Sequence, residues 1–267
     1  MQPDKKPQSM LVCCSPNYSS VQPLILFDVC LLKEANICKR HPGKQTRMRG
    51  KGLQQTAQET NQMTTACIYL IRHAHVLTPR PRRFLGQTDI ALSKQGQRQA
   101  LALRPLFADL SFDSLFSSPL LRARQTAQLA TGRSAQDIRV VEQFKEIDLG
   151  EWEGLTVEEV RQKYPGQYER RGLDFKNFRP LNGESFADVQ QRVVEAFEHI
   201  CTICPGKTLI VAHAGVNRTL LAHLLPSPLE DILTIPQDYC GINILDMSMH
   251  RPIVQAINTH SFPSSAP

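Results

Sequence analysis

The sequence predicts an α/β fold in which helices cover both faces of a mostly parallel central sheet, a three-layer α/β/α sandwich. Continuous apolar, β-prone runs at 67–71 and 207–212 are typical of strands that are buried on both faces. Amphipathic helical segments alternate with these and other short strands up to about residue 258, which favours a parallel sheet. Ligands of such sheets gather beyond the carboxyl ends of the strands.

The helices have recognisable ends. Ser93 is suited to cap a helix that runs to about Leu110, and Pro105 should kink it. A capping box, Ser185 with Asp188, starts a long helix with apolar residues at a spacing of three to four. The remaining expected elements are strands at 112–116, 138–141, 239–245 and 253–257, and helices at 156–163, at 215–225 and from Pro119 to Gly132.

The composition is that of an ordinary globular protein. The 267 residues are 41% hydrophobic and 21% charged, which excludes a mostly disordered, collagen-like or coiled-coil chain. No apolar run approaches the ~18 residues that a membrane helix needs. The net charge of +6 suggests an anionic partner, and the eight cysteines suggest disulfides or a metal site. The positions of these residues decide between those interpretations.

Residues 1–63 differ from the rest of the chain. They contain nine basic and four acidic residues, so that they account for +5 of the net charge, together with four of the eight cysteines. We expect a basic, disordered leader in front of one domain at 64–267. Two alternatives stay open: the leader contacts nucleic acid or lipid, or translation starts at Met63.

The domain itself is nearly neutral, and this removes the argument for a nucleic-acid or membrane partner. Its four thiols fit a reducing compartment, so we expect a cytoplasmic protein that is a monomer or a homodimer. Cys201 and Cys204 have redox spacing, but they end an amphipathic helix and no further ligand stands nearby. We interpret them as ordinary thiols.

Polar groups with a shared chemistry follow four of the predicted strands. Arg72 and His73 follow the first strand, and Arg122 lies in the helix after the second. Glu146 lies in the loop after the third strand, and His213 follows the strand at 207–212. Since the carboxyl ends of parallel strands share one edge of a sheet, these side chains should converge on one crevice.

This set of side chains suits phosphoryl transfer. Two guanidinium groups bind a phosphate, and a neutral histidine is a competent nucleophile towards phosphorus. A second histidine can stabilise the equatorial oxygens, and a carboxylate can protonate the leaving oxygen and then activate water. The arginines supply the positive charge, so that neither a metal nor a cofactor is predicted.

The motifs around these residues resemble those of the histidine phosphatase superfamily, also called the phosphoglycerate mutase-like family. The resemblance covers roughly residues 67–258. It rests on Leu70-Ile71-Arg72-His73, on residues 86–93 and 117–127, on Glu146 to Gly154, on Gly183-Glu184-Ser185 and on residues 211–218.

The resemblance implies the three-layer fold and a metal-independent reaction through a phosphohistidine. By matched position, His73 is the nucleophile and Glu146 the proton donor, with Asp148 as the weaker rival for that role. Arg72, Arg122 and His213 form the phosphate pocket, so that His213 is expected to act both in binding and in catalysis. Arg83 corresponds to a residue that often faces the substrate, although a solvated loop charge is an equal interpretation of it, and Glu184 is a further candidate for substrate binding.

Two departures from the family pattern stand near the nucleophile. Ala74 and His75 replace the usual Gly and Glu after the Arg-His pair, and Pro79 stands where many members have a phosphate-binding Asn. One pocket donor is therefore expected to be missing or to come from the basic loop 80–83. In the last motif Ala214 replaces a Gly, which should be tolerated.

The short segment from Glu146 to Gly154 resembles phosphatases rather than the cofactor-dependent mutases. We therefore expect a phosphomonoesterase of a small phosphorylated metabolite. Within the family the short loop resembles α-ribazole phosphatases and broad-specificity phosphatases, and α-ribazole 5'-phosphate is the leading named substrate. A phosphoglycerate mutase and a non-catalytic phosphate-binding domain are the alternatives.

Overall fold

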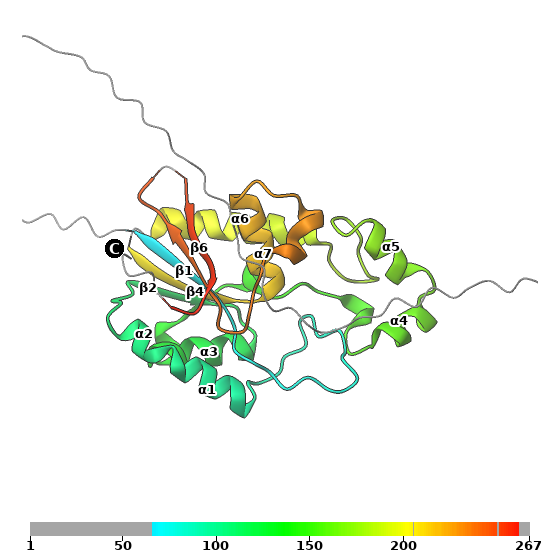
Figure 1. The fold of residues 1–267 in the computed structure, drawn as a ribbon, viewed down its shortest axis with the longest axis horizontal. Helices are drawn as coiled ribbons and strands as arrows, with labels where there is room; N and C mark the ends of the chain where they lie inside the picture. The colour runs from blue at the N-terminus through cyan, green and yellow to red at the C-terminus, as the bar shows by residue number, and fades with distance from the viewer. Residues whose placement is uncertain (1–65, 205, 250, 262–267) are drawn as a thin grey trace, which may run out of the picture. The chain divides into compact units, whose positions relative to one another are not determined.

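A six-stranded sheet in the order β3-β2-β4-β1-β5-β6 forms the centre of the computed structural model (Figure 1). The structure describes residues 66–204, 206–249 and 251–261, so that the predictions for residues 1–63 lie outside the described residues. The strands are β1 (Cys67–Arg72), β2 (Ser114–Ser117), β3 (Arg139–Val140), β4 (Lys207–Ala212), β5 (Ile242–Asp246) and β6 (Ile253–Thr259).

The four strands β3, β2, β4 and β1 are parallel, whereas β5 and β6 are antiparallel to their neighbours. In the central pairs Arg72 lies beside Ala212, and Ser117 lies beside Val211. The carboxyl ends of β1, β2 and β4 therefore stop at the same edge of the sheet. The predicted mixed, mostly parallel α/β fold is confirmed.

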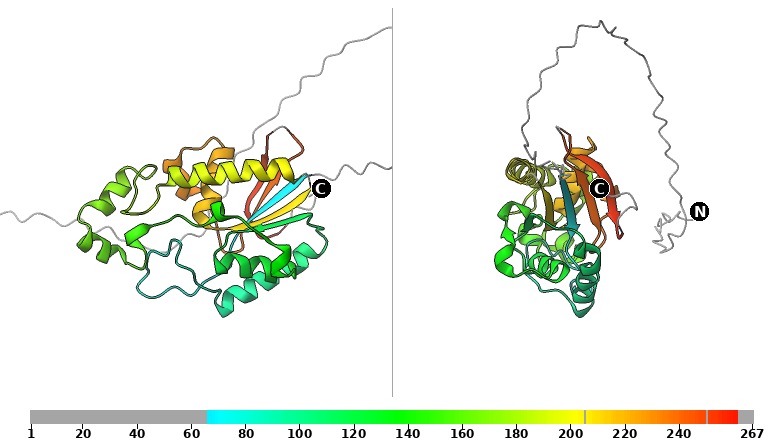
Figure 2. Two further views of the ribbon diagram at one scale, coloured as in Figure 1. Left: turned by 180° about the vertical axis from the view of Figure 1, so that it is seen from behind. Right: turned by 90° about the vertical axis from the view of Figure 1, so that its left-hand side faces the viewer.

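Helices cover both faces of this sheet (Figure 2). On one face lie α1 (Lys94–Ala102), α2 (Arg104–Ala108) and α3 (Leu121–Thr131), and on the other α6 (Phe186–Ile203) and α7 (Ala214–Leu224). Because successive strand residues point to opposite faces, β1 and β4 contribute to both cores. Tyr69 and Leu209 belong to the core cluster with α1–α3, while Leu70 and Ile210 belong to the cluster with α6 and α7.

Two short helices, α4 (Val157–Lys163) and α5 (Gln167–Leu173), lie at one end of the domain (Figure 1). Short 3₁₀ helices occupy Ala135–Asp137, Glu142–Phe144, Gly150–Trp152 and Leu229–Thr234. Trp152 is fully buried and packs against Phe84 and Phe178, which anchors the segment around α4 and α5 to the core.

The structure refines the predicted helices. The segment expected as one kinked helix from Ser93 forms α1 and α2, which are divided at Leu103 because Pro105 lacks the N–H that would continue the helix. The capping box at Ser185 is present. Gly132 ends α3 with φ 72°, a left-handed conformation that suits glycine. The helix α5 was not predicted, since it lacks an apolar face.

No helix among the described residues combines the length and the apolarity needed to cross a bilayer. The described cysteines, Cys67, Cys201, Cys204 and Cys240, are free thiols. Cys201 and Cys204 pack against the core cluster that lines α6 and α7.

Candidate active site

His73 lies directly after β1 at the carboxyl edge of the sheet and is 5% exposed. Its backbone N–H donates to Ala212 O (2.9 Å), and the next residue donates to Thr126 Oγ1 (2.9 Å). The ring nitrogen Nδ1 lies 2.8 Å from Ala74 O. A carbonyl only accepts hydrogen bonds, so we assign the ring hydrogen to Nδ1 and the lone pair to Nε2.

The charge state of His73 follows from its surroundings. Burial, and then the positive charges of Arg122 and Arg72, hold the pKa of His73 well below its usual value. The imidazole is therefore neutral near pH 7. A neutral ring with a fixed Nδ1–H and a lone pair on Nε2 is the form that attacks phosphorus.

Arg122, in the first turn of α3, is buried and held by main-chain carbonyls. Nη1 donates to Thr88 O and Nη2 to Gly86 O, both at 2.8 Å. Glu153 fixes this loop by accepting from Gln87 N (2.5 Å) and from Thr88 Oγ1 (2.7 Å). Gly86 has φ +48°, and a Cβ there would lie 2.0 Å from the Glu153 carboxylate. Only glycine lets the loop approach Glu153 this closely.

Arg72, the last residue of β1, is held by the segment that precedes β5. Its Nη1 donates to Gln237 O (2.6 Å), and its guanidinium carbon lies 4.0 Å from the centre of the Tyr239 ring. The same ring contacts His73 and His75, with centroids 5.6 and 5.2 Å away. Tyr239 therefore forms one wall of the site.

His213 is fully buried at the N-cap of α7, and its ring centre lies 5.1 Å from that of His73. Nε2 lies 2.7 Å from Ser118 Oγ, which in turn accepts from Leu120 N (3.2 Å). We assign the hydroxyl hydrogen of Ser118 to His213 Nε2, which leaves the ring hydrogen on Nδ1. Burial, His73 and both arginines hold the pKa of His213 well below its usual value.

Glu146 lies against the first turn of α7. Its Oε2 accepts from Gly215 N (3.2 Å) and its Oε1 accepts from Ile147 N (2.9 Å). A Cβ at residue 215 would lie 2.4 Å from Oε1, so that glycine is required for this approach. The carboxylate thereby meets the positive end of the α7 helix dipole.

The other predicted carboxylates have structural partners. The Glu184 carboxylate accepts hydrogen bonds from Nε (2.7 Å) and Nη2 (2.8 Å) of Arg192. It also accepts one from Asp148 N (2.9 Å). Arg192 donates further to Lys145 O (2.9 Å) and Glu146 O (3.2 Å). This ion pair thus fixes the loop that carries Glu146. The Asp148 carboxylate accepts from Gly150 N (2.8 Å) and caps the turn that follows.

Arg83 also has protein partners. Its Nη1 donates to Gly154 O (2.7 Å) and to Glu159 Oε2 (2.6 Å), so that it joins the loop to α4. Pro79 lies in an exposed stretch, residues 77–82. The predicted roles of Arg83 and Glu184 towards a substrate stay predictions.

The structure brings the three predicted pocket residues together with His73 and leaves one donor atom of each of the three without a protein partner. Among the described residues, seven buried side-chain polar atoms make no hydrogen bond, and three of them are Arg72 Nε, Arg122 Nε and His213 Nδ1. Buried polar groups are otherwise almost always paired. These donors can serve a tetrahedral oxyanion beside His73.

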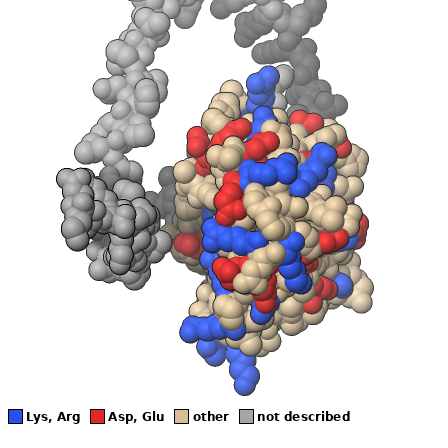
Figure 3. Space-filling model, turned by 90° about the vertical axis from the view of Figure 1, so that its right-hand side faces the viewer, with Lys and Arg blue, Asp and Glu red and all other residues tan. Residues whose placement is uncertain are grey.

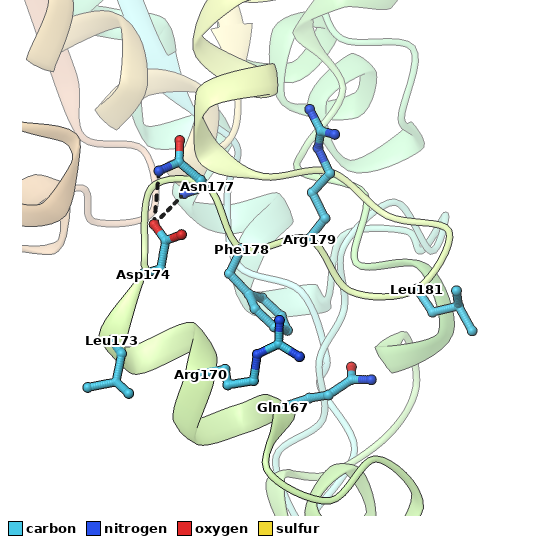
Figure 4. A pocket seen from close by; sticks show the side chains of 8 residues that line it. All are labelled: Gln167, Arg170, Leu173, Asp174, Asn177, Phe178, Arg179 and Leu181. Carbon is cyan, nitrogen blue, oxygen red and sulfur yellow. Dashed lines mark hydrogen bonds between the residues drawn. The ribbon is translucent and has the colours of Figure 1, made fainter.

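A separate cavity of about 450 Å³ lies between α5 and the segment that follows it (Figure 4). It is lined by residues such as Arg170, Phe178 and Arg179 and by none of the site residues. Asp174 accepts a hydrogen bond from Asn177, and Arg179 forms an ion pair with Asp188, so that both charged groups already have protein partners.

Three residues that contribute to the site were not assigned roles from the sequence: Ser118, Tyr239 and Arg192. Ser118 follows β2 directly, and so the rule used for the other residues, polar groups at strand exits, applies to it as well. Tyr239 and Arg192 gave no such signal, because one precedes a strand and the other lies on a helix.

The fold is that of the phosphoglycerate mutase-like proteins. The family model of the histidine phosphatase superfamily (branch 1) matches residues 68–260. The chain therefore belongs to the histidine phosphatase superfamily, which confirms the resemblance found in the sequence.

Solved structures support this assignment. YhfR of Bacillus stearothermophilus superposes with a TM-score of 0.64 at 31% identity, over 71% of this chain and 95% of that one. The α-ribazole phosphatase of Shigella flexneri superposes with a TM-score of 0.68 at 26% identity, over 75% of this chain and 100% of that one.

A wheat (Triticum aestivum) protein, 2-carboxy-D-arabinitol-1-phosphatase, is 28% identical over 204 residues. The match covers 75% of this chain but 41% of the wheat protein. The chain thus spans about two fifths of the length of the plant relatives it matches.

Proposed function

We propose that the chain is a phosphomonoesterase that hydrolyses a small phosphorylated metabolite through a phosphohistidine on Nε2 of His73. The observation that carries the proposal is the set of three unpartnered donors, from Arg72, Arg122 and His213, around a neutral His73. The names of the relatives add to this support, because both the wheat protein and the Shigella protein are named as phosphatases.

The reaction proceeds in two steps. The lone pair on His73 Nε2 forms the P–N bond while the P–O bond to the alcohol breaks, and the alcohol oxygen receives a proton from Glu146. Water then attacks phosphorus, its proton passes to the Glu146 carboxylate, and the P–N electron pair returns to Nε2. The guanidinium groups and His213 Nδ1–H stabilise the equatorial oxygens in both steps without a metal or a cofactor.

Trapping the phosphoenzyme tests the mechanism. A ³²P-labelled phosphomonoester should label the wild-type chain with an acid-labile, base-stable phosphate, and His73→Ala should lose the label and at least about 1,000-fold in turnover. The same substitution at His223, an exposed residue of α7, is the matched control and should keep the label. Labelling of His73→Ala at wild-type level rules out this nucleophile.

A substrate panel addresses specificity. We propose α-ribazole 5'-phosphate as the leading substrate, since an α-ribazole phosphatase is among the similar structures. The panel also contains 2-carboxy-D-arabinitol 1-phosphate, phosphoserine and 3-phosphoglycerate, the last with and without 2,3-bisphosphoglycerate. Release of inorganic phosphate supports the phosphatase, whereas isomerisation of 3-phosphoglycerate would establish a mutase.

A further inference from the structure

Three buried side-chain amides form a cluster beneath the site. The amide cluster consists of Asn217 on α7, Gln237 in the segment before β5, and Asn243 on β5, with exposures of 0%, 3% and 0%. Gln237 Nε2 donates to Asn243 Oδ1 (2.8 Å), and Gln237 Oε1 accepts from the other two amides at 2.9 and 3.1 Å. Burying three amides is costly unless they are hydrogen-bonded to one another or to the backbone.

The cluster fixes the segment that holds Arg72. Asn243 also donates to Leu70 O in β1 (2.9 Å), which ties the cluster to the strand that carries Arg72. The main chain of Gln237 then accepts from the Arg72 guanidinium. Arg72 N donates to Gly241 O (3.2 Å), and Cys240 N donates to Arg72 O (3.1 Å). The segment from 237 to 241 therefore encloses Arg72 from its backbone to its guanidinium.

The amide cluster also lies next to His213, the pocket residue that follows β4. The Asn217 amide also lies 3.2 Å from both His213 O and Arg72 N; it hydrogen-bonds to these two backbone groups only when its amide is flipped, in which case its hydrogen bond to Gln237 Oε1 is lost. One side chain thus lies against the backbones of both pocket residues, at the point where β1 and β4 end side by side.

We propose that the amide cluster is a positioning device that sets Arg72 and His213 relative to one another so that both engage the same phosphate. This inference rests on the proposed function. Two donors act together on one oxyanion only if their separation and angle are fixed, and misplacement by about 1 Å costs on the order of 100-fold in rate. The three amides make no hydrogen bond to Glu146; they are proposed to act through the two pocket residues.

Orthovanadate, an analogue of phosphate in this chemistry, is the probe. Gln237→Met keeps the size and the main-chain carbonyl of residue 237 but removes the amide. We expect it to weaken vanadate binding, measured by calorimetry, by about 10-fold and to lower kcat/KM equally for p-nitrophenyl phosphate and for an alkyl phosphate. The equal loss is expected because Glu146, which serves the leaving group, is unaffected.

Two controls separate positioning from stability. Thr208→Val alters a fully buried polar residue at the opposite end of β4, and Val193→Ala opens a cavity in the core on α6. Both should leave vanadate binding within about 2-fold of wild type, although Val193→Ala lowers Tm. If Gln237→Met does not fold, Asn217→Ala takes its place with the same expectation.

A double-mutant cycle identifies the residue through which Gln237 acts. In an Arg72→Ala background, Gln237→Met should change vanadate affinity by less than about 2-fold, because the group that it positions is gone. Wild-type vanadate affinity in Gln237→Met, or additive effects in the cycle, would overturn the inference alone. Failure of the wild-type chain to bind vanadate would overturn the proposed function as well.

Discussion

His73 and His213 differ in which ring nitrogen is hydrogen-bonded to the rest of the protein. The main-chain carbonyl of Ala74 engages Nδ1 of His73 and leaves Nε2 with its lone pair, whereas Ser118 engages Nε2 of His213 and leaves Nδ1 with its hydrogen. This difference fits the proposed mechanism, in which the ring of His73 attacks phosphorus and the ring of His213 donates a hydrogen bond. Neither role requires a charged imidazole, which agrees with the lowered pKa of both rings.

Substitution of Ser118 tests this division of roles. Ser118→Ala should lower kcat about 10-fold, because His213 loses the partner that fixes its tautomer and its orientation. Ser117 is the matched control: it is equally buried, but its hydroxyl has no partner, so Ser117→Ala should leave kcat within about 2-fold of wild type. Steady-state kinetics of both variants decide the matter, and equal effects would contradict the role given to Ser118.

The pocket residues could be predicted from the sequence because each is specified locally. Arg72, His73 and His213 directly follow apolar runs that read as strands, and Arg122 follows a strand by a few residues. The partners of these residues could not be predicted in this way. Gln237 lies far from Arg72 along the chain, and a polar residue in a loop gives no sign that it will be buried.

The first turn of α7 provides the site with a close approach of the backbone to Glu146 and with a backbone N–H donor. His213 occupies the N-cap position of the helix, and the first turn offers Gly215 N to Glu146. The loop that carries Glu146 is fixed from the other side by Arg192 on α6. Glu146, the proposed acid, is thus held between two helices that pack together on one face of the sheet.

Gly215→Ala tests the requirement for a close approach. The new Cβ would lie 2.4 Å from Glu146 Oε1, so that the carboxylate must move. We expect kcat for an alkyl phosphate to fall about 10-fold, with a smaller loss for p-nitrophenyl phosphate, whose leaving group needs little protonation.

The matched control for this prediction is Gly172→Ala on α5, where a Cβ meets nothing within 4 Å. It should leave the kinetics unchanged and stabilise the chain by about 0.5–1 kcal/mol, since alanine loses less backbone entropy in a helix. Equal losses for the two substrates in Gly215→Ala would argue against the assignment of Glu146 as the acid.

For the whole molecule, the location of the charge matters more than its total. The end of the domain around α4 and α5 shows basic and acidic side chains interspersed (Figure 3), in keeping with ion pairs such as Arg161 with Glu169. The positive charge relevant to the proposed reaction is instead buried, in Arg122 and in part in Arg72.

The buried histidines make stability depend on pH. Their pKa lies below 6.5 in the folded chain, so that the unfolded chain binds protons first as the pH falls through 6.5. The free energy of unfolding should therefore decrease as the pH is lowered from about 6.5. The decrease is up to about 1.4 kcal/mol per pH unit for each histidine, and it ends when the pH reaches the folded-state pKa.

Urea denaturation at pH 7.5, 6.5 and 5.5 measures this dependence. His73→Gln should flatten the acid side of the profile relative to wild type, and the same substitution at the exposed His199 serves as the control. A profile of His73→Gln that is parallel to the wild type would show that His73 is not held neutral by the fold.

The strand order has a consequence for the synthesis of the protein. β4 lies between β2 and β1, so that these two strands acquire a common neighbour only after residues 207–212 have been made. A nascent chain that stops before Lys207 contains His73 and Arg122 but has no sheet to join them. The pocket is therefore assembled only after β4 has been made, and until then the apolar strand β1 has neither β4 nor β5 to pair with and exposes unpaired strand edges.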